Sequence, residues 1–300
     1  MIIEYLIIIK LTDITIIIVS FRSEKIISKC LLTINKKYPV IVLENSSNIN
    51  FKKKIEKDFS NVKCYLMGKN LGFGKANNIG LNLAKTKYVF LLNPDTLLSR
   101  NTIKILSKNA KKIKDFALLA PVILNNKHPN YGFFNKKEKF VKKNDYFEVD
   151  YIKGFAMFFN KKNFLNIGFF DEKIFIYLEE IDLCKRLNQI NKKIYVIPKA
   201  KIKHIGGQSH SYEYNLEMEI SRNWHWMWSN FYYNTKHFGK LYAYKRTIYF
   251  FLKSFFKMFF YFFLNKKKFL INKSRFSGLL NSYLGNNSFY RPFSSDGKTK

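Results

Sequence analysis

Short apolar runs alternate with amphipathic stretches along the first two thirds of the chain. The run at residues 14–19 is continuous and β-branched, as in a strand buried on both faces, and residues 40–43, 62–67 and 88–92 predict further short strands. Residues 23–34 and 51–59, which lie between the runs, have helical spacing. This alternation predicts an α/β fold with a doubly wound, mostly parallel central sheet flanked by helices. Ligands of such sheets bind at the carboxyl ends of the strands.

The pattern continues to about residue 210 and then changes. Residues 154–159 and 194–197 predict further strands, and residues 175–186 predict the start of a helix. Aromatic and basic residues dominate afterwards, and residues 247–264 combine eighteen mostly apolar positions with Lys253 and Lys257 on one helical face. We expect this C-terminal helical extension to lie in the plane of an anionic membrane rather than to span it, although a single span stays open.

These shifts predict three regions: a domain at 12–235, a basic aromatic helical membrane-associating segment at 236–284, and a flexible tail at 285–300. Residues 1–10 are apolar, but they lack the basic start and the cleavage site of a signal peptide and are too short to span a bilayer. They fit an extra edge segment or an over-long gene start.

The charge balance adds a question about partners. The 53 Lys and Arg residues against 21 Asp and Glu give a net charge of +32, which is typical of proteins that meet nucleic acid or an anionic membrane. The joint excess of Lys, Asn, Ile, Phe and Tyr also fits a compositional bias of the coding sequence. No nucleic-acid-binding motif is present, so we expect no nucleic-acid partner. Three widely spaced cysteines argue against a disulfide framework and against a cysteine zinc site.

Three short segments carry candidate chemistry. The glycines of residues 70–80 open a helix whose amides suit a phosphate or a sugar hydroxyl, although such a segment, taken alone, is more often a plain turn. Asp95 follows a buried strand, where a carboxylate can hold a phosphate-bound divalent cation or can cap the next helix. Glu179, Glu180 and Asp182 crowd one helix start, so we expect at least one raised pKa; the alternative is a solvated first turn. His204 precedes two glycines, which leaves room for a metal or a phosphate.

In this order the segments resemble family 2 glycosyltransferases with the GT-A fold, and in particular their bacterial rhamnosyltransferase-like branch. The matching pieces span about residues 12–210 and are residues 19–21, 44–47, 70–80, 91–95, Gly154, 175–186 and 204–209.

The resemblance implies a role for each matching residue. Ser20, Glu44, Asn45, Asn70, Gly72, Asn78, Asn93 and Gly154 would line the nucleotide-sugar site, with Glu44 where the family usually has Asp. Asp95, in the position of the family's Asp-x-Asp, and His204 would hold Mg²⁺ or Mn²⁺. Glu180 occupies the position of the catalytic base, and Asp182 remains the alternative.

The implied activity is inverting transfer of rhamnose or another hexose from a nucleotide-diphosphate donor to a glycan or lipid-linked acceptor during cell-surface polysaccharide synthesis. The expected location is the cytoplasm, at the inner face of the cytoplasmic membrane; the oligomeric state stays open. Two rival hypotheses are a basic protein that binds an anionic surface or nucleic acid, and a catalytically inactive GT-A scaffold.

Overall fold

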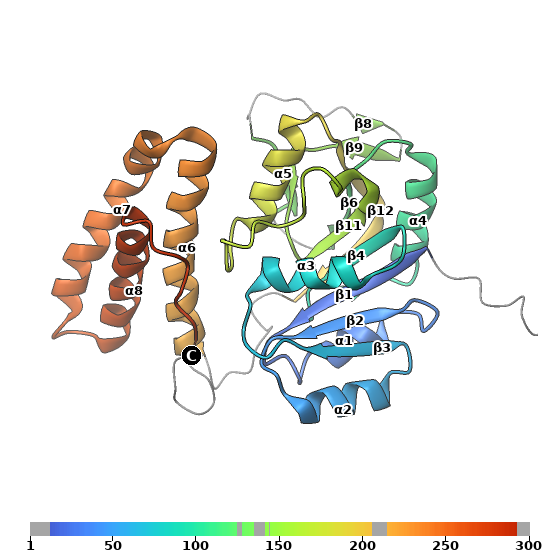
Figure 1. Cartoon of the computed structure of the whole chain (residues 1–300), viewed down its shortest axis with the longest axis horizontal. Coiled ribbons are helices and arrows are strands. Elements are labelled where there is room, and N and C mark those ends of the chain that lie inside the picture. Colours follow the sequence, from blue (N-terminus) through green and yellow to red (C-terminus); the bar gives the residue numbers. More distant parts are fainter. Residues whose placement is uncertain (1–12, 125–127, 135–141, 144, 206–214, 293–300) are drawn as a thin grey trace, which may run out of the picture. The chain divides into compact units, whose positions relative to one another are not determined.

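A computed structural model of the chain describes residues 13–124, 128–134, 142–143, 145–205 and 215–292 (Figure 1). The N-terminal run at 1–10, residues 206–209 of the histidine motif and the end of the predicted tail lie outside the described residues. The chain divides into two compact units. The sheet unit comprises Met1–Lys69, Ala76–Phe169 and Cys184–Ser209, and the helical unit comprises Asn70–Lys75, Phe170–Leu183 and His210–Lys300.

A ten-stranded mixed sheet forms the centre of the sheet unit, in the order β3-β2-β1-β4-β11-β6-β12-β9-β8, with β5 paired to β12. Figure 1 shows β3, β2, β1 and β4 in this order. The strands are β1 (Ile14–Ser20), β2 (Val40–Glu44), β3 (Val62–Leu66), β4 (Tyr88–Leu92), β5 (Thr96–Leu98), β6 (Leu118–Ile123), β8 (Lys142–Lys143), β9 (Tyr146–Glu148), β11 (Ala156–Asn160) and β12 (Ile194–His204). A separate pair joins β7 (Tyr131–Gly132) to β10 (Tyr151–Ile152).

The sheet confirms the predicted α/β class and also fixes one edge as the place where candidate side chains collect. Strands β3, β2, β1 and β4 are parallel, β11 runs antiparallel between β4 and β6, and β12 is parallel to β6. The ends of β1, β2, β4 and β12 and the start of β11 therefore lie along the same edge. Strand β12 extends past the predicted end at 197, because Pro198 lies within a register shift between Ile197 and Lys201.

Helices connect these strands. They are α1 (Ile27–Leu32), α2 (Ile49–Asp58), α3 (Phe73–Leu83), α4 (Thr102–Lys112), the 3₁₀ helix η2 (Lys161–Phe164) and α5 (Glu179–Gln189). Helix α1 is shorter than the predicted 23–34, because the Ser23 hydroxyl donates a hydrogen bond to the Phe21 carbonyl and holds a turn there. Helix α2 packs against β3, and α4 packs against β12 and β6.

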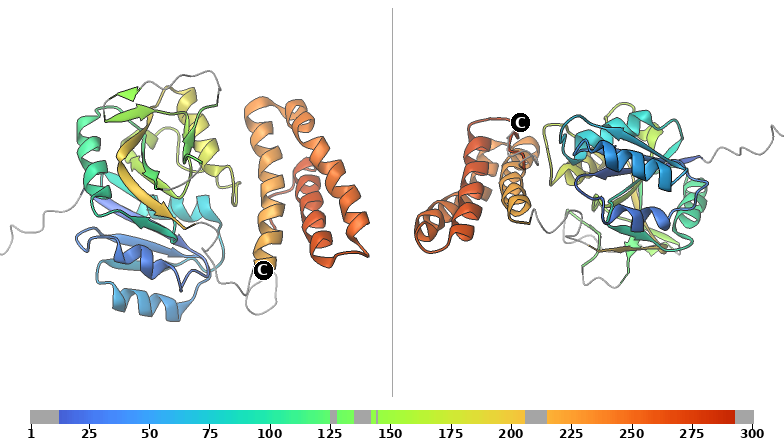
Figure 2. Two further views of the ribbon diagram at one scale, coloured as in Figure 1. Left: turned by 180° about the vertical axis from the view of Figure 1, so that it is seen from behind. Right: turned by 90° about the horizontal axis from the view of Figure 1, so that it is seen from below.

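Three long helices build most of the helical unit: α6 (Asn215–Phe238), α7 (Lys240–Tyr261) and α8 (Lys266–Tyr283), which lie side by side in orange to red (Figure 2). Their core contains Met227, Phe231, Ala243 and Leu279. Gly278 lets α8 approach α6 closely, since a Cβ there would lie 2.3 Å from the Trp224 carbonyl oxygen. Among the described residues, no helix combines the length and apolar character needed to cross a membrane.

Candidate functional site

Ser20 and Glu44 lie side by side at the sheet edge, because they end β1 and β2 in matched register. Both side chains are fully buried. One oxygen of Glu44 accepts hydrogen bonds from the Ser46 amide at 2.8 Å and from the Ser46 hydroxyl. The other oxygen, Oε2, and the Ser20 hydroxyl make no hydrogen bond of good geometry with the described residues, although the hydroxyl lies close enough to the Glu44 carboxyl to lower its pKa. Buried polar atoms nearly always have a hydrogen-bond partner, so Glu44 Oε2 and the Ser20 hydroxyl are available to bind a polar ligand.

Burial raises the pKa of Glu44, and the opposing effects of Ser46 and Ser20 only partly offset it. Asn45 follows immediately, is buried, and donates its amide N–H to the Ser20 carbonyl at 2.8 Å. The predicted nucleotide-pocket residues Ser20, Glu44 and Asn45 are therefore brought together. Asn78 is buried on α3 in the same unit.

Asp95 lies in the turn that follows β4. The Asn93 amide donates to the Phe155 carbonyl at 3.0 Å, and the Thr96 amide donates to the Asn93 carbonyl at 3.1 Å, which ties the turn to the start of β11 beside Gly154. The turn leads into β5, and α4 begins only after Asn101. The alternative that Asp95 merely caps the next helix is therefore wrong.

His204 ends β12 and meets Asp95 across the β5–β12 pairing. Its Nε2 lies 3.2 Å from Asp95 Oδ1, its ring stacks on Phe155 with centroids 4.2 Å apart, and the Ile205 amide donates to the Asp95 carbonyl. The Asp95 side chain is 2% exposed and that of His204 is 19% exposed. Despite their proximity, neither Oδ1 nor Nε2 has a hydrogen bond within the described part of the chain.

This donor pair fits a divalent cation. Two ligands at right angles on an octahedral ion with bonds of about 2.1 Å are separated by about 3 Å, close to the observed separation. The described residues contain no group of three His, Cys, Asp or Glu side chains placed to hold a metal. An ion with two protein ligands suits Mg²⁺ or Mn²⁺, which share substrate phosphates and retain waters.

The glycine-rich loop Asn70–Lys75 belongs to the helical unit, where it packs against Phe170–Leu183. Gly72 has φ +82°, and a Cβ there would lie 2.3 Å from the Phe175 carbonyl oxygen. The same carbonyl accepts a hydrogen bond from the Phe73 amide at 2.9 Å, and Asn70 accepts one from the Gly72 amide. Chain packing thus explains Gly72, and nucleotide binding by Asn70 and Gly72 stays a prediction.

Helix α5 begins at Glu179 with the predicted cluster of carboxylates in its first turn. Glu179 is 5% exposed and Asp182 is completely buried, so a solvated first turn is wrong. Burial, together with the neighbouring Glu180, raises the pKa of Glu179 well above its usual value, which confirms the expected raised pKa. Glu180, which contributes to this shift, is itself half-buried.

Asp182 is held by two cationic or hydrogen-bonding partners from α6. The Lys236 ammonium lies 2.7 Å from Asp182 Oδ1, and His237 Nε2 lies 2.8 Å from the same oxygen. Lys236 also contacts Asp171 at 2.7 Å. Sequence reasoning missed Lys236 and His237, because no local pattern links them to carboxylates more than fifty residues away.

The turn before Glu179 is strained. Tyr177 and Leu178 have φ of 72° and 68°, in the left-handed region that side chains with a Cβ disfavour. Helix α6 holds this turn, since Ser229 donates a hydrogen bond to the Ile176 carbonyl at 3.0 Å and Trp226 packs edge-on against Tyr177. The sequence gives no signal for this strain, which fixes the direction in which α5 begins.

Ligands of α/β sheets bind at the carboxyl ends of the strands, and a carboxylate there can hold a divalent cation that is shared with a substrate phosphate. The model of glycosyl transferase family 2 matches residues 15–170, more than half of the chain, and the protein belongs to this family. It is therefore a nucleotide-sugar-dependent glycosyltransferase. The resemblance noted in the sequence is confirmed.

Two curated relatives support this assignment. The rhamnosyltransferase WbbL of Escherichia coli (strain K12) is 27% identical over 218 residues, which cover 63% of this chain and 82% of WbbL. The low-salt glycan biosynthesis hexosyltransferase Agl10 of Haloferax volcanii is 26% identical over 200 residues, which cover 61% of this chain and 64% of Agl10.

A solved structure supports the fold. The mannosyltransferase PcManGT of Pyrobaculum calidifontis, determined in complex with GDP-Man and Mn²⁺, matches with a TM-score of 0.55 at 10% identity. The match covers 90% of this chain and 86% of PcManGT. The GT-A-like architecture is thus confirmed.

Proposed function

We propose that this glycosyltransferase binds its nucleotide-diphosphate sugar at the sheet edge and carries a divalent cation on Asp95 and His204. The observation that carries this proposal is the pair of buried atoms, Asp95 Oδ1 and His204 Nε2, which lie 3.2 Å apart without a hydrogen bond. The Mn²⁺ in the structure of PcManGT supports the same choice of cofactor.

Ser20, Glu44 and Asn45 would bind the nucleoside part of the donor. Their buried unsatisfied atoms offer a hydroxyl and a carboxyl oxygen for base or ribose groups. Asn93 and Gly154 flank the Asp95 turn, where backbone and amide groups would contact the diphosphate sugar. The proposal extends to Asn70, Gly72 and Asn78, at and after the glycine-rich loop.

The cation would offset negative charge on the departing diphosphate. The buried Asp95 carboxylate would offset part of the positive charge of the cation. Phe155 holds the His204 ring in place by stacking on it, so the ring would bind the cation without reorganising. These residues bind and orient the donor.

Glu180 would act as general base toward the acceptor hydroxyl. Asp182 is completely buried and engaged by Lys236 and His237, whereas Glu180 is half-buried, which favours Glu180 for this role. Glu179 would carry the proton of the crowded pair, which leaves Glu180 as the proton acceptor. Attack from the face opposite the leaving group makes the transfer inverting.

The donor sugar would be rhamnose or another hexose, and the reaction would belong to glycan synthesis; the names of the rhamnosyltransferase and hexosyltransferase relatives support this proposal. The acceptor would be a sugar hydroxyl on a glycan or on a lipid-linked glycan. We expect such an acceptor to be met at the cytoplasmic face of the membrane.

The test of the base compares Glu180→Gln with Asp182→Asn. The readouts are nucleotide-diphosphate release from dTDP-rhamnose, UDP-hexoses and GDP-mannose, and donor affinity by calorimetry. Because positioned proton transfer contributes about 10²- to 10⁴-fold, Glu180→Gln should lose turnover by about that factor and retain donor affinity.

Asp182→Asn is the discriminating comparison. It should lower the stability of the helical unit more than it lowers turnover of the folded fraction. Near-normal turnover in Glu180→Gln, with loss in Asp182→Asn, would reverse the assignment. Donor binding without turnover of any sugar in the unmodified chain would favour the inactive scaffold.

A further inference from the structure

Helix α7 presents a large apolar face to solvent. Phe256 is 66% exposed, Leu241 is 80% exposed, and Phe263 just beyond the helix is 90% exposed. The other exposed apolar residues of this region are Tyr242, Ile248, Tyr249, Phe250, Leu252, Phe259, Phe260, Phe262 and Leu264. We call the exposed apolar residues from 241 to 264 the aromatic face. Exposed patches of this kind mark interaction sites in native proteins.

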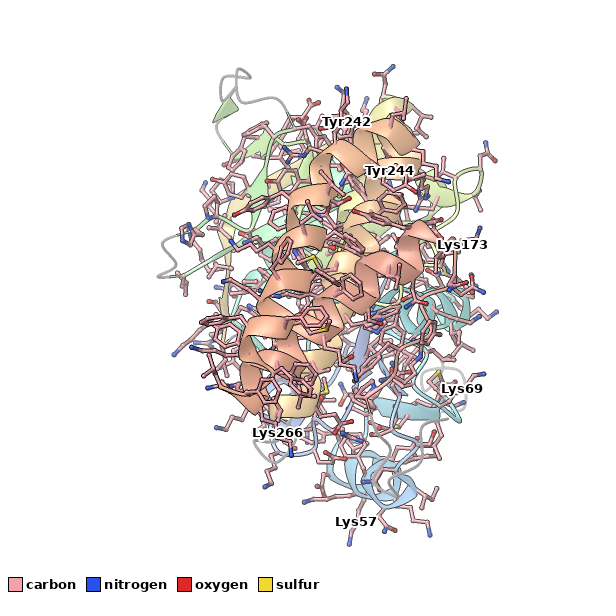
Figure 3. The ribbon with its side chains drawn as sticks, turned by 90° about the vertical axis from the view of Figure 1, so that its left-hand side faces the viewer. Lys57, Lys69, Lys173, Tyr242, Tyr244 and Lys266 are labelled. Carbon is pink, nitrogen blue, oxygen red and sulfur yellow. The ribbon has the colours of Figure 1, made fainter. Side chains whose placement is uncertain are left out.

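The aromatic face is distinct from the side of α7 that packs within the bundle. Ala243, Thr247 and Ser254 are buried, and the Thr247 hydroxyl lies 2.9 Å from that of Tyr283 on α8. These three small residues follow helical spacing along one side of α7. The side chains of the aromatic face point away from this side, so packing within the bundle does not account for them. Figure 3 looks onto α7, with Tyr242 and Lys266 labelled toward its two ends.

Cations border the aromatic face. Arg246, Lys253 and Lys257 are all exposed and are spaced by seven and four residues, which places them on one flank of the helix. Further cations stand at both ends: Lys240, Lys245, Lys266, Lys267 and Lys268. No Asp or Glu occurs in the sequence between Glu219 and Asp296. Lys267 pairs with Glu219 of α6 at 2.8 Å, whereas α7 itself carries no acidic residue. The surface of α7 is thus apolar along its centre and positive along its border.

We propose that the aromatic face of α7 docks in the interface of an anionic lipid membrane, with the helix axis in the plane of the membrane. An apolar face bordered by Lys and Arg is the pattern of interfacial helices, in which rings enter the headgroup and acyl boundary and cations meet lipid phosphates. The flexible Lys253 and Lys257 stems let both ammonium groups reach that layer.

Charge and chemistry select this occupant over two others. A second copy would bring an equally positive border against the first, which opposes association. Nucleic acid would be met by cations, but the exposed Phe and Leu side chains at the centre offer no hydrogen bonds to phosphate or base edges. Only an anionic lipid surface matches both the apolar centre and the positive border. This inference is independent of the proposed reaction.

The experiment is sedimentation of the full chain with phosphatidylcholine vesicles, with and without phosphatidylglycerol, at low and high salt. Binding should require phosphatidylglycerol and weaken with salt. The double variant Lys253→Gln/Lys257→Gln should bind about thirtyfold more weakly, since each cation near an anionic surface contributes about fivefold. The double variant Phe256→Ser/Phe260→Ser should lose at least about tenfold per side chain.

Matched controls lie in the sheet unit. Leu32→Ser/Leu165→Ser removes two exposed apolar side chains, and Lys57→Gln/Lys69→Gln removes two exposed charges, of residues labelled in Figure 3. Both controls should bind vesicles like the unmodified chain, and unchanged melting temperatures would show that all variants fold.

Three results would overturn the proposal. The first is absence of vesicle binding, or binding that the α7 variants leave unchanged. The second is a dimer that Phe256→Ser/Phe260→Ser converts to a monomer in light scattering, without vesicle binding, because a second copy would then cover the face. The third is binding of a random oligonucleotide that only Lys253→Gln/Lys257→Gln abolishes, again without vesicle binding.

Discussion

His225 should make the helical unit acid-sensitive. Its ring is completely buried on α6, stacked on Phe175 with centroids 4.4 Å apart. Nε2–H donates to the Tyr290 carbonyl at 2.8 Å, so in the neutral ring Nδ1 accepts from the Ser288 hydroxyl at 2.9 Å. Burial, with a smaller contribution from the nearby Arg291 guanidinium, lowers the pKa of His225 to about 3, and the hydrogen bond to the Tyr290 carbonyl only partly opposes this effect. Both nitrogens are thus satisfied only in the neutral form.

The direction of the pH effect follows from linkage. Between pH 3 and 6.5 the unfolded chain binds a proton at this histidine and the folded chain does not. The free energy of unfolding therefore falls as pH falls below 6.5, the ordinary value. At pH 5, with a folded pKa of about 3, the loss from this one group is about 2 kcal/mol relative to pH 8.

Tryptophan fluorescence isolates this effect. All three tryptophans lie on α6, so their emission reports unfolding of the helical unit. Urea titrations of the unmodified chain and of His225→Gln at pH 8, 7, 6 and 5 give the contribution of His225 to the free energy of unfolding, which should decline as pH falls. His225→Gln should lower stability at every pH, yet remove about 2 kcal/mol of the decline between pH 8 and pH 5.

The test rests on the difference in the free energy of unfolding between the unmodified chain and His225→Gln at each pH. Glu179 has a raised pKa and acts in the opposite direction, because it binds more protons when folded, but its contribution is common to both chains. The exposed His128 provides the control, since His128→Gln should leave the decline unchanged. Parallel pH profiles for the unmodified chain and His225→Gln would refute the reasoning.

Two further substitutions test contacts within the helical unit, and a third tests the exposed ion pairs of Asp145. Gly278→Ala should lower the free energy of unfolding by about 2 kcal/mol, because the new Cβ collides with the Trp224 carbonyl; urea unfolding followed by fluorescence checks it. Lys236→Met should cost about 2 kcal/mol in the same assay, less than a fully buried pair, because Lys236 is 28% exposed while Asp182 is fully buried. Asp145→Asn should leave the melting temperature unchanged, since its pairs with lysines are solvated.

The central strands of the sheet could be predicted from the sequence, because they are buried on both faces and appear as continuous apolar runs. Residues 14–19 and 88–92 match β1 and β4 closely for this reason. The meeting of Asp95 with His204 was also predictable, though only through the resemblance to a family. Strand β12 reaches His204 through an irregularity at Pro198 that its apolar pattern does not show.

The contacts of α6 that hold the carboxylates at the start of α5 could not be predicted from the sequence. Lys236, His237 and Ser229 contact residues more than fifty positions earlier, and one helical pattern in α6 is compatible with many partners. The left-handed backbone at Tyr177 and Leu178 is imposed by those contacts rather than by local preference. Tertiary packing, and not sequence periodicity, decides which carboxylate at the start of α5 stays accessible.

The most direct test of the donor site is thermal stabilisation of the purified chain by UDP, dTDP, GDP and CDP, each with and without Mn²⁺. A nucleotide at a hundredfold excess over its Kd stabilises the folded state by about 2.7 kcal/mol, a readily measured shift. We predict a Mn²⁺-dependent shift with one nucleotide that Asp95→Asn abolishes and Asp145→Asn retains. A shift that persists in Asp95→Asn, or no shift with any nucleotide, would contradict a donor site built on Asp95 and His204.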